Sequence, residues 1–238
     1  MEDSMKWEQA MQSEYNSIMA NKTWKLIELP EGEQALPCKW VYKTKHTTDD
    51  PEPKYKARLV AKGFKEKKGV DFDEIFSPMI KMTTLGLLLG LVATEDMELI
   101  QMDVKTAFLH GDLEEDIYMV QPEGFVIKLE KPTRTEFVCR LLKALYDLNQ
   151  GSRQWYQKFD KYISSQGYVR SQEDHCLYTW KLSDGSLIIL ILYVDDMLIA
   201  RKSKGEIKNL RESLSKQFSM KDFGDANHFL DMCIKRDR

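Results

Sequence analysis

Two unbroken apolar runs, separated by a pair of acidic residues, stand out in the hydrophobic pattern of the chain. Residues 187–194 read Leu-Ile-Ile-Leu-Ile-Leu-Tyr-Val, and residues 197–200 read Met-Leu-Ile-Ala. Neither run approaches the roughly 20 apolar residues that a membrane-spanning helix needs. Short runs rich in Ile, Leu and Val are typical of buried strands, and two residues form the commonest hairpin loop. The pattern therefore predicts a tight hairpin with Asp195 and Asp196 as its loop.

The rest of the chain alternates between helical and strand-like patterns. Apolar residues spaced three and four apart predict helices over residues 4–20, from Ser77 to Val92, through Trp155 to Ile163, and over residues 203–218. Runs of apolar and β-branched residues bounded by turn residues predict strands. These are expected after Trp24, at 99–103, 112–119, 137–146, 176–180 and 228–234. The succession predicts a mixed α+β fold.

A lysine-rich hairpin is predicted near the N-terminus. Residues 39–45 and 54–62 are separated by the turn-forming residues Asp-Asp-Pro-Glu-Pro at 49–53. Because side chains alternate in a strand, the basic residues of each strand gather on one side. These residues are Lys39, Lys43 and Lys45 in the first strand, and Lys56, Arg58 and Lys62 in the second. Two readings remain open, a solvated edge that discourages aggregation and a phosphate-binding surface.

Composition narrows the class of protein. The chain has 238 residues, 42% of them hydrophobic, and a net charge of −3, which predicts one large domain or two small ones. Its four cysteines are too widely spaced for a zinc signature or a disulfide framework, and no apolar leader opens the chain. From Lys39 to Lys68, however, ten Lys and Arg face four Asp and Glu, a local charge of about +6. A basic segment on a mildly acidic body suits the capture of a polyanion.

The acids at the predicted strand ends suggest a metal site. Asp103 is the last residue of the strand predicted at 99–103, where an Asp is also a common helix cap, and Asp195 and Asp196 could serve only as turn formers. If both segments lie in one sheet, the three carboxylates could converge. Paired carboxylates are typical Mg²⁺ ligands, and two such ions could activate a hydroxyl and neutralise a leaving pyrophosphate.

Ordered motifs along nearly the whole chain resemble the reverse transcriptase of copia-type LTR retrotransposons. They are Lys39-Trp-Val, Tyr55-Lys-Ala-Arg-Leu-Val-Ala-Lys-Gly63, Phe76-Ser-Pro78, Gln101-Met-Asp-Val-Lys-Thr-Ala-Phe-Leu109, Tyr118-Met-Val-Gln-Pro-Glu-Gly-Phe125, Leu145-Tyr146 with Gln150, Arg153 and Trp155, and Tyr193-Val-Asp-Asp196. The resemblance implies a right-hand polymerase fold with an antiparallel palm sheet, packed helices, and a thumb that is absent or truncated. It implies fingers mainly over 22–100 with part of 120–150, and a palm mainly over 101–119 and 151–238.

The resemblance also implies roles for individual residues. Asp103, Asp195 and Asp196 match the catalytic carboxylates, and Val104 is assigned with them to the metal site. Lys56, Arg58 and Phe108 match the residues that bind the incoming dNTP, with Phe108 excluding a ribose 2′-hydroxyl. The expected template and primer contacts are Gln150, Arg153, Tyr193, Phe229 and Leu230.

The expected cofactor is Mg²⁺, as two ions, with Mn²⁺ as an alternative. The expected partners are dNTPs, an RNA or DNA template with its primer, and the RNase H and integrase regions of the same polyprotein, with no membrane. The family implies an intracellular location, in a cytoplasmic virus-like particle or in the nucleus. The chain ends at Arg238, where a thumb and an RNase H domain are expected, so a fragment of a polyprotein or a truncated element is predicted.

Several positions depart from the family's pattern, including Ser152 where proline is usual and Asp231 where glycine is usual. Asp147 stands where glycine is usual, Asn149 where lysine is usual, and Gly86 where arginine is usual. At about 6 Å and an effective dielectric of about 20, the charge of Asp147 would repel a phosphate by roughly 3 kcal/mol, about a hundredfold in rate. The alternative hypothesis is therefore a degenerate, catalytically inactive copy that keeps the fold and at most binds nucleic acid. A two-metal nuclease is disfavoured because it leaves Phe108 and the basic hairpin without a role.

Overall fold

The chain folds into two compact units, each assembled from two separate segments. The computed structural model describes residues 2–47, 50–127, 137–202, 204–230 and 232–237. Unit 1 comprises Met1–Phe76 and Phe108–Trp155, and unit 2 comprises Ser77–Ala107 and Tyr156–Arg238. Both units combine helices with antiparallel strands, which confirms the expected mixed class. The division into fingers and palm, drawn at other boundaries, remains a prediction.

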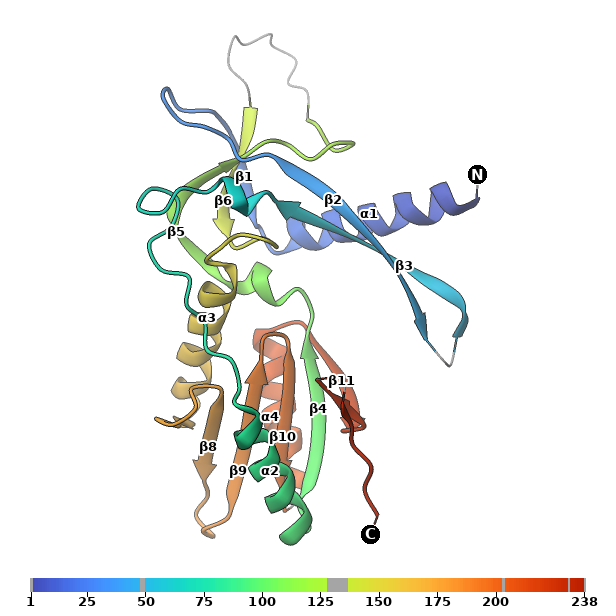
Figure 1. Ribbon diagram of the computed structural model, residues 1–238, viewed down its shortest axis with the longest axis vertical. Helices are drawn as coiled ribbons and strands as arrows, with labels where there is room; N and C mark the ends of the chain where they lie inside the picture. The colour runs from blue at the N-terminus through green and yellow to red at the C-terminus, as the bar shows by residue number, and fades with distance from the viewer. Residues whose placement is uncertain (1, 48–49, 128–136, 203, 231, 238) are drawn as a thin grey trace. The chain divides into compact units, whose positions relative to one another are not determined.

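Unit 1 contains a three-stranded sheet and a long hairpin (Figure 1). The sheet has the antiparallel order β1-β6-β5, and the hairpin pairs β2 with β3. A buried cluster that includes Ile18, Leu59 and Leu141 forms its core. The elements are α1 (Glu2–Ala20), β1 (Trp24–Glu28), β2 (Cys38–Thr47), β3 (Asp50–Ala61), the short 3-10 helix η1 (Gly63–Lys65), η2 (Ala107–His110), which begins at the unit boundary, β5 (Asp112–Met119) and β6 (Phe137–Lys143).

The lysine-rich hairpin is confirmed, with a longer second strand than expected. Thr47 pairs with Asp50, so the turn does not extend to residue 53, and Pro53 lies within β3. Trp7 of α1 contacts the rings of Tyr42 and Tyr55 edge-on, at centroid distances of 5.1 and 4.6 Å. Because these tyrosines lie on the face opposite the lysines, α1 covers the aromatic side of the hairpin and leaves the basic side uncovered by this helix.

Unit 2 contains a six-stranded antiparallel sheet, in the order β11-β4-β10-β9-β8-β7. A separate two-stranded hairpin joins β12 and β13. The elements are α2 (Met82–Thr94), β4 (Glu98–Val104), most of α3 (Gly151–Ser165), β7 (Val169–Arg170), β8 (Leu177–Lys181), β9 (Leu187–Tyr193), β10 (Asp196–Arg201), α4 (Lys204–Gln217), β11 (Met220–Asp225), β12 (His228–Phe229) and β13 (Met232–Cys233).

The two apolar runs are the central strands of this sheet, and helices cover both of its faces (Figure 1). On one face Ile189 and Leu198 pack in a cluster with Leu88 of α2. The other face carries the alternate residues, and there Phe159 of α3 meets Phe218 in a stacked ring pair at 6.1 Å. Burial on both faces explains why these strands lack the polar alternation of a half-exposed strand.

Several elements differ from the expected ones. Helix α2 begins at Met82 rather than Ser77, and the Asp174 carboxylate accepts a hydrogen bond from the Lys81 N–H just before its first turn. The expected strand at 228–234 is a tight hairpin, and strand β11 was not expected at all. Across the part of the chain that the structure describes, no helix is long and apolar enough to cross a membrane.

Candidate functional site

The acidic pair lies at the tip of the β9–β10 hairpin, next to the end of β4. Asp196 is the first residue of β10 and pairs across the hairpin with Tyr193, so the loop consists of Val194 and Asp195. The prediction that both acids form the loop is therefore wrong by one residue. The reason is that β10 also pairs with β4, which gives Asp196 the ladder position directly opposite Asp103.

The loop has an unusual backbone. Val194 has a φ of 53°, a left-handed conformation that a β-branched residue rarely adopts. A two-residue loop with positive φ only at its first position matches a type II′ turn, in which that position normally holds glycine. The Asp195 carbonyl accepts a hydrogen bond from the Val104 N–H at 2.8 Å. The neighbouring strand therefore holds this strained turn in place.

Charges of both signs meet across the sheet at this point. Asp103 and Asp196 are directly opposite each other, so their side chains share a face with Cβ atoms about 4.5–5.5 Å apart, where like charges are destabilising. Lys221 of β11 is opposite Asp103 on its other side. Sequence reasoning missed Lys221 because it missed β11. The helix-cap reading of Asp103 is wrong, because Asp103 lies inside β4 and the next helical turn begins only at Ala107.

The chemistry of these donors suits a hard cation. Carboxylates and main-chain carbonyls are the ligands that Mg²⁺ takes, and two opposed carboxylates gain from a cation between them. In the conformation described, however, no group of three or more His, Cys, Asp or Glu side chains among the described residues is arranged to hold an ion. The donor types and the strand register fit a divalent metal, whereas the side-chain positions do not form a closed ion cage.

A separate cavity of about 390 Å³ lies in unit 1. Arg58, Phe108, Tyr146 and Asp147 contribute to its lining. The Arg58 guanidinium lies 5.0 Å from the centroid of the Tyr146 ring, and the Phe108 ring meets the same tyrosine edge-on at 5.3 Å. Two of the three predicted dNTP-binding residues therefore share one cavity. The third, Lys56, is exposed, does not line the cavity and is opposite Lys43 in the hairpin.

A buried carboxyl group lies near these cations. Glu14 of α1 is only 8% exposed, and burial raises its pKa, although Arg58 and Lys56 act in the opposite direction. Its Oε1 atom has no hydrogen-bond partner, and neither has the buried Nε atom of Arg58. Sequence reasoning took this helix as packing alone, since a single Glu among other polar residues gives no signal of burial.

Comparison with known protein families shows the family to which this chain belongs. The family described as reverse transcriptase (RNA-dependent DNA polymerase) matches residues 21–238. The chain belongs to the reverse transcriptase family. The match covers both units, so it includes the carboxylates of unit 2 and the cavity of unit 1.

Similar proteins are plant Pol polyproteins, which confirms the predicted copia-type relationship. The chain is 54% identical over 229 residues to the retrovirus-related Pol polyprotein from transposon TNT 1-94 of Nicotiana tabacum, covering 96% of this chain and 17% of that protein. It is 38% identical over 232 residues to the corresponding polyprotein from transposon RE1 of Arabidopsis thaliana, covering 97% of this chain and 16% of that protein. The chain thus spans about a sixth of the length of these relatives.

One solved structure with a similar course of the chain is an apo telomerase from Candida tropicalis. The sequence identity is 9%, the match covers 91% of this chain and 55% of that chain, and the TM-score is 0.40. Likeness at this level does not identify a function.

Within this reverse transcriptase domain, three of the departures from the family pattern, at Asp147, Asn149 and Gly86, have different surroundings, whereas Asp231 lies outside the described residues. Asp147 has a φ of 66°, which explains why glycine is usual there, and it lines the cavity with Arg58. Asn149 donates from its side chain to the Gly63 carbonyl and to the Glu66 carboxylate, each at 2.9 Å. A Cβ atom at Gly86 would meet nothing within 4 Å, so the space is open to a larger residue.

The residues predicted to contact template and primer differ in accessibility. Gln150 has no exposed surface and donates from Nε2 to the Asp71 carbonyl at 3.1 Å, and Phe229 is only 2% exposed in the core of unit 2. Any contribution of these two side chains to nucleic-acid binding is therefore indirect. Arg153 forms an ion pair with Glu74 at 2.8 Å. Tyr193 and Leu230 are partly exposed, and Leu230 has a φ of 49°.

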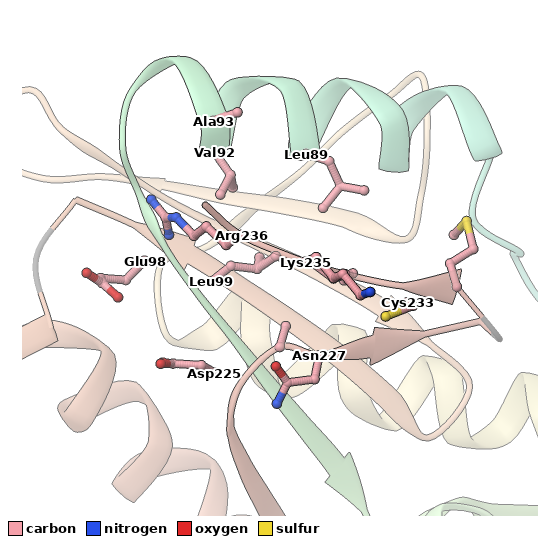
Figure 2. Close-up of a pocket in the computed structure, with 13 residues that line it drawn as sticks. Leu89, Val92, Ala93, Glu98, Leu99, Asp225, Asn227, Cys233, Lys235 and Arg236 are labelled. Atoms are coloured by element: carbon pink, nitrogen blue, oxygen red, sulfur yellow. The ribbon is translucent and has the colours of Figure 1, made fainter. Parts of the chain in front are cut away.

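Unit 2 also contains a cavity of about 840 Å³ that is lined by both apolar and charged side chains (Figure 2). Leu89, Val92 and Ala93 of α2 line one side, and Cys233 and Arg236 of the C-terminal segment line another. None of the predicted catalytic or substrate-binding residues takes part in its lining. This cavity is therefore separate from the site formed by Asp103, Asp195 and Asp196.

Proposed function

We propose that this domain is an RNA-directed DNA polymerase that transfers a nucleotide from a dNTP to a primer 3′-hydroxyl with the help of two divalent metal ions. The observation that carries the proposal is the strand register that sets Asp196 opposite Asp103, with Asp195 in the adjoining turn. Membership of the reverse transcriptase family supports it.

The carboxylates have a defined task in this reaction. Asp103, Asp195 and Asp196 would hold the ions, and the main chain of Val104 fixes the turn through its hydrogen bond to Asp195. When bound, such ions lower the pKa of the primer hydroxyl and offset charge on the leaving pyrophosphate. The rigid double-faced burial of β9 and β10 keeps the carboxylates in position, because neither strand can shift without exposing its apolar side chains.

The cavity of unit 1 supplies nucleotide recognition in this proposal. Arg58 would pair with the triphosphate, helped by the exposed cation Lys56, since guanidinium groups bind phosphate in a bidentate manner. Phe108 would close the wall beside the sugar, and its edge-on contact with Tyr146 fixes the ring in that wall. A rigid aromatic wall excludes an added hydroxyl by steric contact, which gives selection for deoxyribonucleotides.

Primer extension tests the activity. The purified domain, with a primer annealed to an RNA template, dNTPs and Mg²⁺, is expected to lengthen the primer, and Asp195→Asn is expected to abolish extension. Asp184→Asn is the matched control, because Asp184 lies in the β8–β9 turn, between strands that do not pair with β4, and its carboxylate accepts hydrogen bonds from Ser186. Absence of extension by the parent domain under all metal and salt conditions would reject the polymerase proposal.

A second experiment tests the role of Phe108. Phe108→Ala is expected to admit ribonucleotides, measured as the ratio of rNTP to dNTP incorporation, while Phe108→Tyr keeps the ring and the selection. An unchanged ratio in the alanine variant would show that the wall lies elsewhere.

One observation favours the alternative of an inactive copy, namely that Asp147 lines the same cavity as Arg58. In that case the parent domain shows no extension, and a repaired chain with Asp147→Gly, Asn149→Lys and Gly86→Arg does. Extension by the parent at a rate equal to that of the repaired chain would reject the alternative.

A further inference from the structure

Glu14 is a buried acid in helix α1 to which the proposed reaction gives no part. Its side chain is only 8% exposed, and its Oε1 atom has no hydrogen-bond partner among the described residues. The match to the reverse transcriptase family begins at residue 21, after this helix, so family membership assigns Glu14 no role. A glutamate is almost never buried to this extent unless another group compensates its charge.

The Glu14 carboxyl group lies at the outer edge of β3, away from β2. It accepts a hydrogen bond from the Leu59 main-chain N–H. Two residues further along the same strand, the Ala61 N–H donates to the Tyr146 carbonyl at 3.1 Å. N–H groups two residues apart in a strand point to the same edge, and β2 occupies the opposite edge. Glu14 and the main chain of Tyr146 therefore follow one another along one edge of β3.

Arg58 approaches the same edge from the basic side of the hairpin. Its guanidinium lies 5.0 Å from the centroid of the Tyr146 ring, and its Nε atom is buried and has no hydrogen-bond partner in the described part of the chain. Burial raises the pKa of Glu14, and among the groups that oppose this rise Arg58 acts most strongly. A buried acceptor, Glu14 Oε1, and a buried donor, Arg58 Nε–H, thus lie near each other.

The hydrogen bond from Leu59 does not explain why residue 14 is an acid. An amide or a hydroxyl would accept the same bond without the cost of burying a carboxylate. A buried ion pair is also weak evidence for a gain in stability. A buried acid next to a residue that is proposed to bind substrate is, in contrast, typical of functional sites. The charge of Glu14 is therefore better explained by its effect on Arg58 than by the fold.

We propose that Glu14 is a positioning residue for nucleotide binding, which orients Arg58 toward the triphosphate. The proposal rests on the proposed polymerase function, in which Arg58 binds that group. A carboxylate behind the Nε–H of a guanidinium leaves the two terminal NH₂ groups for bidentate pairing with phosphate. Because the side chain is then ordered before the dNTP arrives, binding avoids the cost of ordering it. This saving corresponds to roughly three- to tenfold in affinity.

Glu14→Gln tests the proposal, because the amide oxygen still accepts the Leu59 N–H while the charge is lost. In single-nucleotide incorporation, KM for dNTP is expected to rise roughly three- to tenfold and kcat to change by less than about twofold, since orientation of Arg58 acts on binding rather than on the chemical step. Glu8→Gln is the matched control, because Glu8 is exposed on the same helix and its replacement changes the net charge equally. Thermal unfolding shows whether each variant is folded.

A double-mutant cycle shows whether Glu14 acts through Arg58. Arg58→Gln alone is expected to raise KM for dNTP, and Glu14→Gln added in that background is expected to raise it no further. An equal further rise would show that Glu14 acts on the fold of unit 1, and would overturn the proposal. A KM that Glu14→Gln lowers would overturn it as well, because the carboxylate would then only weaken the charge of Arg58. An unchanged KM, or an equal rise in Glu8→Gln, has the same consequence.

Equilibrium binding of a fluorescently labelled dNTP in Mg²⁺ provides the same comparison where turnover is absent. If Arg58→Gln weakens binding and Glu14→Gln does not, the positioning role is overturned while the proposed function stands. If the parent binds no dNTP, or if Arg58→Gln binds it as tightly as the parent, the role of Arg58 in the proposed function is overturned, and the positioning role with it.

Discussion

Replacement of Asp147 separates the cost of its backbone from the cost of its charge. The residue has a left-handed backbone and lines the cavity that holds Arg58. Asp147→Gly removes both the strained conformation and the carboxylate. Asp147→Asn removes only the charge, because asparagine keeps the shape of the side chain and tolerates the same backbone.

The two effects differ in size. A left-handed backbone costs an ordinary residue about 1–2 kcal/mol, and Asp147→Gly relieves that strain. The greater freedom of glycine in the unfolded chain cancels about 0.4–1 kcal/mol of this gain. Asp147→Gly is therefore expected to raise the free energy of unfolding by about 0.5 kcal/mol. Asp147 is exposed, which makes an effective dielectric of about 40 appropriate. At an assumed separation of about 6 Å from a phosphate, the repulsion is then roughly 1.4 kcal/mol, or about tenfold in dNTP affinity.

Two measurements check these values. Denaturant unfolding is expected to rank the glycine variant above both the asparagine variant and the parent. Single-nucleotide incorporation is expected to give both variants a KM for dNTP about tenfold below that of the parent, and fluorescence binding of a labelled dNTP gives the same readout where turnover is absent. A KM that improves with glycine but not with asparagine would refute the electrostatic reasoning. Parent-like values in both variants would show that Asp147 does not face the triphosphate.

Three further changes test other features of the domain. Gly86→Ala is expected to raise the free energy of unfolding by about 0.5–1 kcal/mol in denaturant titrations, because Gly86 lies inside α2 with open space around it; a loss of stability would contradict this. Because burial raises the pKa of Glu14, its contribution is favourable below the unfolded pKa and is lost as the pH rises through the folded pKa. In unfolding experiments at several pH values, Glu14→Gln is thus expected to be more stable than the parent by about 1 kcal/mol at neutral pH. This difference in the free energy of unfolding is expected to disappear toward pH ~4, and a difference that does not change with pH would contradict the burial of an ionisable Glu14. Asp196→Asn is expected to raise stability in EDTA by about 0.5 kcal/mol, since it removes the repulsion from Asp103 and leaves Asp103 opposite Lys221, and to abolish stabilisation by Mg²⁺; equal Mg²⁺ stabilisation of variant and parent, measured by thermal shift, would argue against this metal site.

Much of the secondary structure follows from the hydrophobic pattern. The helix before residue 21, the basic hairpin and the strands on either side of the acidic pair all lie where periodicity predicts them. These elements bury one consistent set of side chains, so local pattern and tertiary environment agree. Asp103, Asp195 and Asp196 were also predicted together; Asp103 and Asp196 do lie opposite each other on paired strands of one sheet, and Asp195 lies in the adjoining turn.

The exact position of the turn could not be read from the same pattern. Residues 187–194 are apolar throughout because the sheet is covered on both faces, and such a run contains no polar alternation to mark where the strand ends. The end is set by pairing with β4, which is distant in the sequence. Strand β11 was missed for a related reason. Its sequence, Met-Lys-Asp-Phe-Gly-Asp, contains residues of low strand propensity, and only the pairing with β4 makes it a strand.

Burial of polar residues was also hidden from the sequence. Gln150 and Arg153 were assigned to template and primer because polar residues in a motif suggest contact with a ligand. In the structure Gln150 is buried against Asp71, and Arg153 is paired with Glu74. Both acids belong to the segment that follows the short 3-10 helix η1 in the sequence. A polar residue can therefore be characteristic of a motif because it fixes a neighbouring loop rather than because it touches a substrate.

Two of the non-glycine residues with a left-handed backbone, Val194 and Asp147, show that this domain tolerates such strain for different reasons at different positions. Each has a left-handed backbone without being glycine, which costs on the order of 1–3 kcal/mol and persists only where the surroundings impose it. At Val194 the surroundings are the ladders of β9 and β10 and the hydrogen bond from Val104, so the strain keeps the carboxylates in register. At Asp147 the neighbouring contact is the close packing of Gly63 on its carbonyl, which any residue at 147 can provide. The strain at Val194 is therefore tied to the geometry of the carboxylates. At Asp147, in contrast, glycine would make the same contact with Gly63 without any backbone strain.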